Sequence, residues 1–167
     1  MKNRQGFTLI ELLLVIALLG LLAIILLGNF NQTLMRGRDS QRKNDMAQLQ
    51  RALESYYEDN HTYPTFTSIF GQGLCTTQAC AVNDTNYMVK TPNDPNSAYT
   101  YLYVPAPTPN PSGPSSSYYM YTYIENTLDK GQNISQKGFT TNAKCGTNIA
   151  CRYYVSSSGA PQLTPSP

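Results

Sequence analysis

The stretch that decides the fold lies at the amino terminus, where residues 6–27 read GFTLIELLLVIALLGLLAIILL. From Phe7 to Leu27 nearly every residue is apolar, and Glu11 carries the only charge. A helix of that length covers roughly 30 Å, about the thickness of a bilayer's hydrocarbon core. A conventional signal peptide is disfavoured, because its apolar region spans only about 7–15 residues and ends at a small-residue cleavage site. The sequence therefore predicts a membrane-spanning helix from Phe7 to Leu27.

Two residues distinguish this segment from a generic span. Glu11 lies inside the apolar run, where an ionised carboxylate costs on the order of 3 kcal/mol, so we expect it to have a partner. Gly6 and Phe7 follow a short polar leader that contains Lys2 and Arg4. A glycine at a helix start and a carboxylate in a first turn are each ordinary. The combined spacing Gly-Phe-Thr-Leu-Ile-Glu is much more specific.

Residues 6–11 and the apolar run resemble the amino terminus of type IV prepilins and of type II secretion pseudopilins, and the resemblance covers about residues 1–63. It implies that residues 1–6 form a leader, that a prepilin peptidase cuts between Gly6 and Phe7, and that Phe7 becomes the methylated terminus. It also implies that Glu11 pairs with the terminal amine of a neighbouring subunit. Burying either charge alone is costly, and pairing reduces that cost.

The resemblance implies a structural filament subunit without catalytic activity. Its partners would be identical or related pilin subunits, an inner-membrane assembly platform, the prepilin peptidase and membrane lipid. The chain would reside in the bacterial cytoplasmic membrane before assembly and afterwards in an extracellular filament at the cell surface. A type IV pilus-like filament is the first hypothesis, and a type II secretion pseudopilus is the alternative. A membrane-anchored surface adhesin that never polymerises is a second alternative.

The basic residues near the span, counted alone, indicate an orientation opposite to that of an exported head. Lys2 and Arg4 precede it, and four basic residues follow it: Arg36, Arg38, Arg42 and Lys43. Taken alone, this count would place the large domain in the cytoplasm. The leader motif and the cysteines favour export, and we give them more weight. The basic cluster itself is interpreted as a solvated helix face with intersubunit salt bridges, in preference to a binding site for phospholipid or DNA.

A second helical segment is expected directly after the span. Residues 7–28 form the transmembrane and assembly helix, and residues 29–60 are predicted as its amphipathic extension, because Met46, Leu49 and Leu53 recur at helical spacing. The pair Gly28-Asn29 is the expected kink. Pro64 cannot continue a helix, so the helix should end near Asn60.

The remaining residues, 61–167, are predicted to form a head rich in Tyr and Pro, which gives an α+β fold with a small antiparallel sheet packed on the helix. Residues 98–104, 117–124 and 152–156 are predicted as strands, and tyrosines alternate with smaller residues in the first two of them. Residues 105–116 are expected to form an extended loop, and residues 161–167 a flexible tail.

Four cysteines lie in two close pairs, Cys75 with Cys80 and Cys145 with Cys151. Their spacings are wider than the Cys-x2-Cys pairs of many zinc sites, so disulfides are the better interpretation, and these imply an oxidising exterior. Four cysteines allow three pairings. Two local loops are the simplest prediction, and cross-links between the two regions stay open.

No cofactor and no catalytic site are expected. The chain has one histidine, His61, which lies beside the predicted helix end, and no nucleophile or phosphate-binding motif is present. Calcium at Asn93-Asp94-Pro95-Asn96 together with Asp84 is the weaker alternative to a plain turn. Specific nucleic-acid binding is also disfavoured: the net charge is +2, and loss of Lys2 and Arg4 with the leader brings the side chains to balance.

Overall fold

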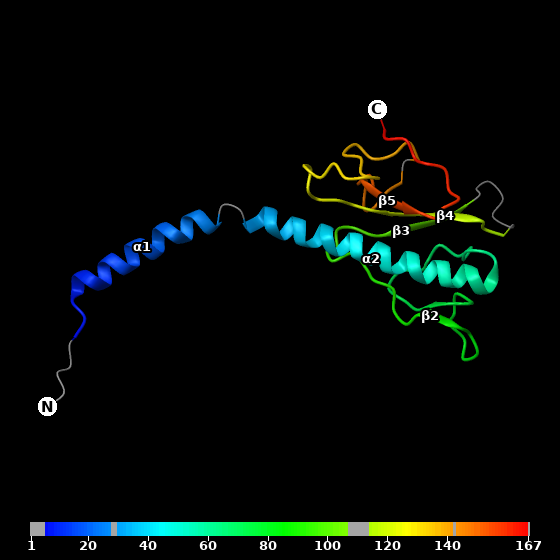
Figure 1. Cartoon of the computed structure of the whole chain (residues 1–167), viewed down its shortest axis with the longest axis horizontal. Helices are drawn as coiled ribbons and strands as arrows, with labels where there is room; N and C mark the ends of the chain where they lie inside the picture. The colour runs from blue at the N-terminus through cyan, green and yellow to red at the C-terminus, as the bar shows by residue number, and fades with distance from the viewer. Residues whose placement is uncertain (1–5, 28–29, 107–113, 142, 167) are drawn as a thin grey trace.

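The computed structural model describes residues 6–27, 30–106, 114–141 and 143–166. Two helices precede a head built around a three-stranded antiparallel sheet, so the predicted α+β fold is confirmed (Figure 1). The elements are α1 (Leu9–Leu27), α2 (Phe30–Asn60), β1 (Leu74–Cys75), β2 (Asn86–Met88), β3 (Leu102–Ala106), β4 (Ser117–Thr122) and β5 (Tyr153–Ser156). The predicted kink at Gly28-Asn29 lies outside the described residues.

The helix α1 is apolar around its whole circumference, and each of its side chains from Leu9 to Ile24 is exposed. In the part of the chain that the structure describes, no helix has both the length and the apolarity needed to cross a membrane.

The helix α2 is amphipathic and supports the head with one face. Met46, Leu49 and Leu53 are fully buried on that face. The helix ends where Asn60 Nδ2 donates to the carbonyl oxygen of Tyr56 at 2.9 Å. His61 follows in the left-handed region, with φ 54°, and its amide donates to Tyr57 O at 2.8 Å. These two bonds satisfy carbonyls that the helix terminus leaves unpaired.

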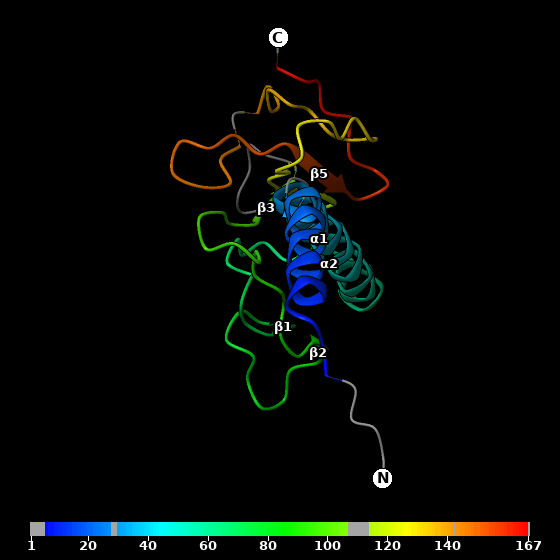
Figure 2. The same cartoon turned by 90° about the vertical axis from the view of Figure 1, so that its left-hand side faces the viewer.

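The three-stranded sheet has the order β3-β4-β5, with Tyr103 opposite Met120 and Met120 opposite Val155. The first strand begins and ends later than the sequence predicts, at Leu102–Ala106 in place of residues 98–104. The amides of Tyr99 and Thr100 donate to Asn96 O and Cys145 O, so ladder pairing starts only at Leu102. The pair β1-β2 has no predicted counterpart, because strands of two and three residues are too short to show alternation. Figure 2 shows β1 and β2 on the opposite side of α2 from β5.

The sheet is covered on both faces, whereas the sequence predicts packing against the helix on one face only. Tyr103, Tyr118 and Met120 belong to the core cluster that includes α2. Tyr119, Tyr121 and Tyr154 belong to a second cluster that contains Phe139 and the disulfide Cys145–Cys151. All six residues of β4 are consequently buried.

The C-terminal segment belongs to this second cover, where the sequence predicts a flexible tail. Tyr119 Oη donates to Pro161 O at 2.8 Å, and Tyr154 Oη donates to Gln162 Oε1 at 2.7 Å. The amide of Ser166 donates to Gly138 O at 3.0 Å. Two buried tyrosine hydroxyls need acceptors, and residues 161–162 supply them. Residue 167 lies outside the described residues.

Candidate functional site

The first candidate site is the start of α1, which contains the predicted processing and assembly residues. Gly6, Phe7 and Thr8 precede the first helical residue and are exposed. A Cβ added to Gly6 would meet no atom within 4 Å, so the Gly6–Phe7 bond lies in an open segment. An extended, uncrowded chain is what a peptidase requires of its substrate.

In this uncut state, Glu11 is bonded to its own helix end. Its Oε2 accepts from Thr8 Oγ1 at 2.9 Å and from Thr8 N at 3.1 Å. The amide of Glu11 donates back to Thr8 Oγ1 at 3.4 Å. This reciprocal arrangement is a capping box, whose sequence signal is Thr-x-x-Glu at residues 8–11. Thr8 therefore competes with any external partner for the Glu11 carboxylate.

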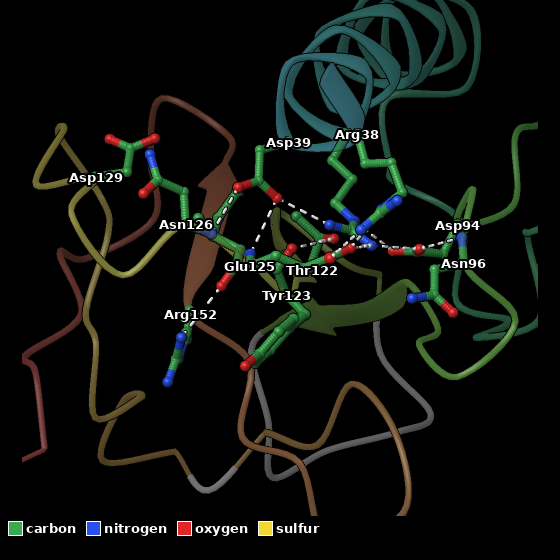
Figure 3. A network of polar contacts seen from close by, with 12 residues as sticks. Arg38, Asp39, Asp94, Asn96, Thr122, Tyr123, Glu125, Asn126, Asp129 and Arg152 are labelled. Atoms are coloured by element: carbon green, nitrogen blue, oxygen red, sulfur yellow. Dashed lines mark hydrogen bonds and ion pairs between the residues drawn. The ribbon is translucent and has the colours of Figure 1, made fainter. Parts of the chain in front are cut away.

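The second charged centre lies where α2 meets the head and is built around Arg42, whose side chain is completely buried. The carboxylates of Asp39, Asp94 and Glu125 converge there (Figure 3). Arg42 Nε and Nη2 donate to the two carboxylate oxygens of Asp94, each at 2.8 Å. Arg42 Nη1 donates to Asp39 Oδ1, and Nη2 lies 2.8 Å from Glu125 Oε1. One guanidinium thus connects α2 to the loop before β3 and to the loop after β4.

The neighbours of Arg42 complete this cluster. Arg38 donates through Nε and Nη2 to both oxygens of Glu125, at 2.8 and 2.5 Å. Asp39 also accepts from the amides of Glu125 and Asn126, at 3.0 and 2.8 Å. Every carboxylate in the cluster has charged or amide donors, as a buried charge requires. The arrangement joins elements, and it lacks an activated nucleophile or a paired acid and base.

Electrostatics in the cluster follow from these bonds. Hydrogen bonds from Arg38 and then Arg42 hold the pKa of the Glu125 carboxyl below its ordinary value, although burial acts in the opposite direction. Burial by itself would lower the pKa of Arg42, but its bonds to Asp94, Glu125 and Asp39 raise it above the ordinary value. Arg42 therefore stays charged at physiological pH.

The prediction of a solvated basic face is wrong for Arg42, which faces the head interior. The salt bridges of Arg38, Arg42 and Lys43 are also intramolecular, with Lys43 Nζ lying 2.6 Å from Asp129 Oδ2. Helical periodicity places Arg42 on the same face as Met46 and Leu49. The signal was available, but an arginine is seldom assigned to a core.

The four cysteines form the two local disulfides that are the simplest pairing. Cys75–Cys80 has a Cα–Cα distance of 5.2 Å and Cys145–Cys151 one of 5.0 Å. Both values fall in the ordinary range for a bridge. The disulfide prediction is therefore confirmed.

The two carboxylates considered for calcium have separate partners. Asp94 is fully engaged by Arg42 and the Asn96 amide, while Asp84 accepts from Thr77 Oγ1 and the Ala81 amide. Among the described residues, no group of three or more His, Cys, Asp or Glu side chains is placed to hold a metal ion. His61, the single histidine, is exposed and forms part of the helix end.

Two family models match this chain. The prokaryotic N-terminal methylation motif covers residues 1–27, and the type II secretion system protein G model covers residues 29–123. The type II secretion system core protein G of Aeromonas hydrophila is 30% identical over 56% of this chain and 69% of that protein. The corresponding protein of Escherichia coli is 30% identical over 56% of this chain and 67% of its own length.

Pilins are also among the relatives. The type IV major pilin PilA of Myxococcus xanthus is 37% identical over 42% of this chain but only 31% of that protein. No solved structure matches the chain significantly. The processing motif, the exposed apolar helix and the helix-on-sheet head define a protein of the pilin and pseudopilin class, so the resemblance seen in the sequence is confirmed. The chain belongs to the type II secretion system protein G family, which is a family of structural proteins.

Proposed function

We propose that this chain is a structural subunit of a type IV pilus-like filament, cut between Gly6 and Phe7 and assembled through α1. The segment from Phe7 to Leu27 would anchor the chain in the bacterial cytoplasmic membrane before assembly. After assembly the head would lie on the outside of an extracellular filament. The partners would be copies of this chain or related pilins, the peptidase, membrane lipid and an inner-membrane assembly platform.

The observation that carries this proposal is the uncovered apolar surface of α1. All its described side chains from Leu9 to Ile24 are exposed, and α1 has no polar face that would suit it to water. An apolar surface of this size has to be covered by lipid or by protein. Lipid covers it in the precursor, and the α1 helices of neighbouring copies cover it in the filament.

Glu11 gives this packing its register. In the precursor its carboxylate is bonded to Thr8, which makes the charge tolerable in an apolar segment. Cleavage creates an ammonium group at Phe7, and a neighbouring copy can offer that group to Glu11. A pair of opposite charges in an otherwise featureless apolar interface then selects one register, because a shifted copy would leave both charges unpaired.

Processing is tested by measuring the mass of the mature amino terminus. We expect a chain that begins with N-methylated Phe7. A retained leader or a different first residue would remove the main support for the proposal.

Assembly is tested with Glu11→Ala in a strain that assembles the wild-type chain. The variant should insert and be cleaved normally but should give few or no filaments. Asp59→Ala, which removes an exposed carboxylate at the other end of α2, serves as the control. A normal filament yield from Glu11→Ala would rule out the proposed role of the charge pair.

A secretion pseudopilus is the second candidate, and the protein G family match over residues 29–123 favours it. Deletion of the gene would then block the export of folded proteins without removing surface filaments. Loss of surface filaments with normal export would favour the pilus. A membrane-anchored adhesin, the third candidate, predicts that no crosslinks form between copies in either case.

A further inference from the structure

One side of α2 carries two opposite charges, one near each end of the helix, and both are exposed. Arg36 and Glu58 are both exposed, and within the described ranges neither makes an ion pair. They are 22 residues apart, which corresponds to about 33 Å along a helix and to positions within about 40° of each other around it. The two side chains therefore share a face but are too far apart to meet in one chain.

The acidic end of this face is disfavoured by local electrostatics. Glu58 and Asp59 lie in the last turn of α2, which contains no basic residue. Negative charge at a helix C-terminus opposes the helix macrodipole, and Glu54 at i−4 adds a like charge on the same side as Glu58. Glu54 has acceptor bonds from Tyr63 Oη and Tyr118 Oη, whereas Glu58 has none among the described contacts. A cation from outside the chain would remove this imbalance.

The basic end is open to another molecule. Residues 30–37 of α2 are all exposed, so the first two turns of this helix project beyond the head (Figure 1). Its apolar side chains Phe30 and Leu34 are 58% and 43% exposed. Arg38, Arg42 and Lys43 already pair with carboxylates of their own chain, which leaves Arg36 as the member of the basic cluster available to a partner.

A second copy of this chain supplies what each end lacks. If two copies run parallel and one is displaced by about 33 Å along the α2 axis, Arg36 of one lies at the height of Glu58 of the other. The same displacement brings residues 30–37 of one copy beside the C-terminal end of α2 in its neighbour. Contacts between different surfaces of identical chains propagate into a helical filament when they do not close into a ring.

We propose that Arg36 of one subunit forms an ion pair with Glu58 of a neighbouring subunit displaced by about 33 Å along the filament axis, and that this contact sets the packing of the heads. The proposal rests on the filament function proposed above. It assigns to the α2 extension a second charge pair, separate from the one at Glu11. An unshifted antiparallel neighbour would also bring these charges together, so the parallel orientation follows from the proposed filament, in which every α1 helix points the same way.

The test is a charge exchange in cells that assemble the wild-type chain. Arg36→Glu and Glu58→Arg should each lower the yield of sheared filaments by up to about fivefold, the upper range for loss of one exposed ion pair. The double variant Arg36→Glu/Glu58→Arg should recover most of the wild-type yield. Mass measurement of the mature terminus and thermal unfolding of each variant in detergent check that processing and head folding are unchanged.

Arg51 provides the matched control, because it is an exposed arginine on the same face of α2 but only 7 residues from Glu58. Rescue of Arg51→Glu by Glu58→Arg, in place of rescue of Arg36→Glu, would overturn the proposed pairing. Absence of any rescue, with wild-type filaments present, would also overturn it and would leave the filament function intact. A wild-type chain that forms no filaments would overturn the filament function and the pairing together.

Discussion

Glu11 lies in an apolar stretch of helix and Arg42 on the buried face of a polar helix, and the protein accommodates these two charges in different ways. Glu11 lies on an exposed helix, where its carboxylate is held by Thr8 of the same turn. Arg42 lies in the head, where its guanidinium reaches carboxylates that are 3, 52 and 83 residues away in sequence. The first charge is satisfied locally and stays available to a neighbour. The second is satisfied by the fold and is unavailable to any partner.

The largest effect is expected from Arg42→Met. The substitution keeps much of the buried volume but leaves Asp39, Asp94 and Glu125 close together without their shared cation. Breaking a buried charge network of this kind costs about 3–5 kcal/mol. Thermal unfolding in detergent micelles should show this loss in the free energy of unfolding. Arg51→Met removes an exposed arginine and should change the free energy by no more than about 0.5 kcal/mol. Equal effects of the two substitutions would contradict the assignment of Arg42 as a core residue.

The two disulfides should contribute different amounts to the free energy of unfolding, although their loops are nearly equal in length. Constraint of the unfolded chain by so short a loop contributes about 2 kcal/mol. Cys145 and Cys151 are both buried in the second cluster, which also contains Tyr121 and Phe139. Cys80, in contrast, is only half-buried. We therefore expect Cys145→Ala/Cys151→Ala to lower the free energy of unfolding more than Cys75→Ala/Cys80→Ala. A larger loss of stability from Cys75→Ala/Cys80→Ala would mean that the second cluster adds little to stability.

Acid should weaken the Arg42 cluster through Glu125. The pKa of this carboxyl is lowered in the folded chain, so the folded state binds its proton less readily than the unfolded state does. Its contribution is complete above the ordinary pKa of 4.5 and is lost as pH falls through the lower folded value.

Glu125→Gln should reduce stability at neutral pH and make its fall below pH 4.5 shallower, as measured by urea unfolding over a pH series. Asp45 acts in the opposite direction, because burial raises its pKa and its ionisation therefore costs stability as pH rises. An unchanged slope in the Glu125→Gln variant would show that the acid sensitivity originates elsewhere.

The smallest effect on the head is expected from Thr8→Val. Loss of the hydroxyl removes two bonds of the capping box without touching any residue of the head. Hydrogen exchange should become faster at the first amides of α1, while the unfolding temperature of the head stays the same. Thr8→Ser keeps the hydroxyl and should behave like the wild-type chain. A shift in head unfolding with Thr8→Val would mean that the two charged regions are coupled.

Local patterns explain which parts of the fold could be predicted. The helices, the three main strands and both disulfides depend on residues that are close in sequence, such as Met46 with Leu49 or Cys145 with Cys151. The short strands β1 and β2 escaped prediction because two or three residues carry no periodicity. The cover on the second face of the sheet could not be predicted either, because Tyr119 and Tyr154 bond to residues 161–162, whose sequence is typical of a polar tail.

By itself, the sequence determined the processing motif, the apolar helix and the lone carboxylate of Glu11, because spacing along one helix is enough to place these groups. Only the tertiary structure decided that Arg42 is buried, that Arg38 and Lys43 pair with Glu125 and Asp129, and that Arg36 makes no ion pair among the described residues. The physical reason is that solvation of a charge depends on every group around it. In the head, those groups include Asp94 and Glu125, which lie far from Arg42 in sequence.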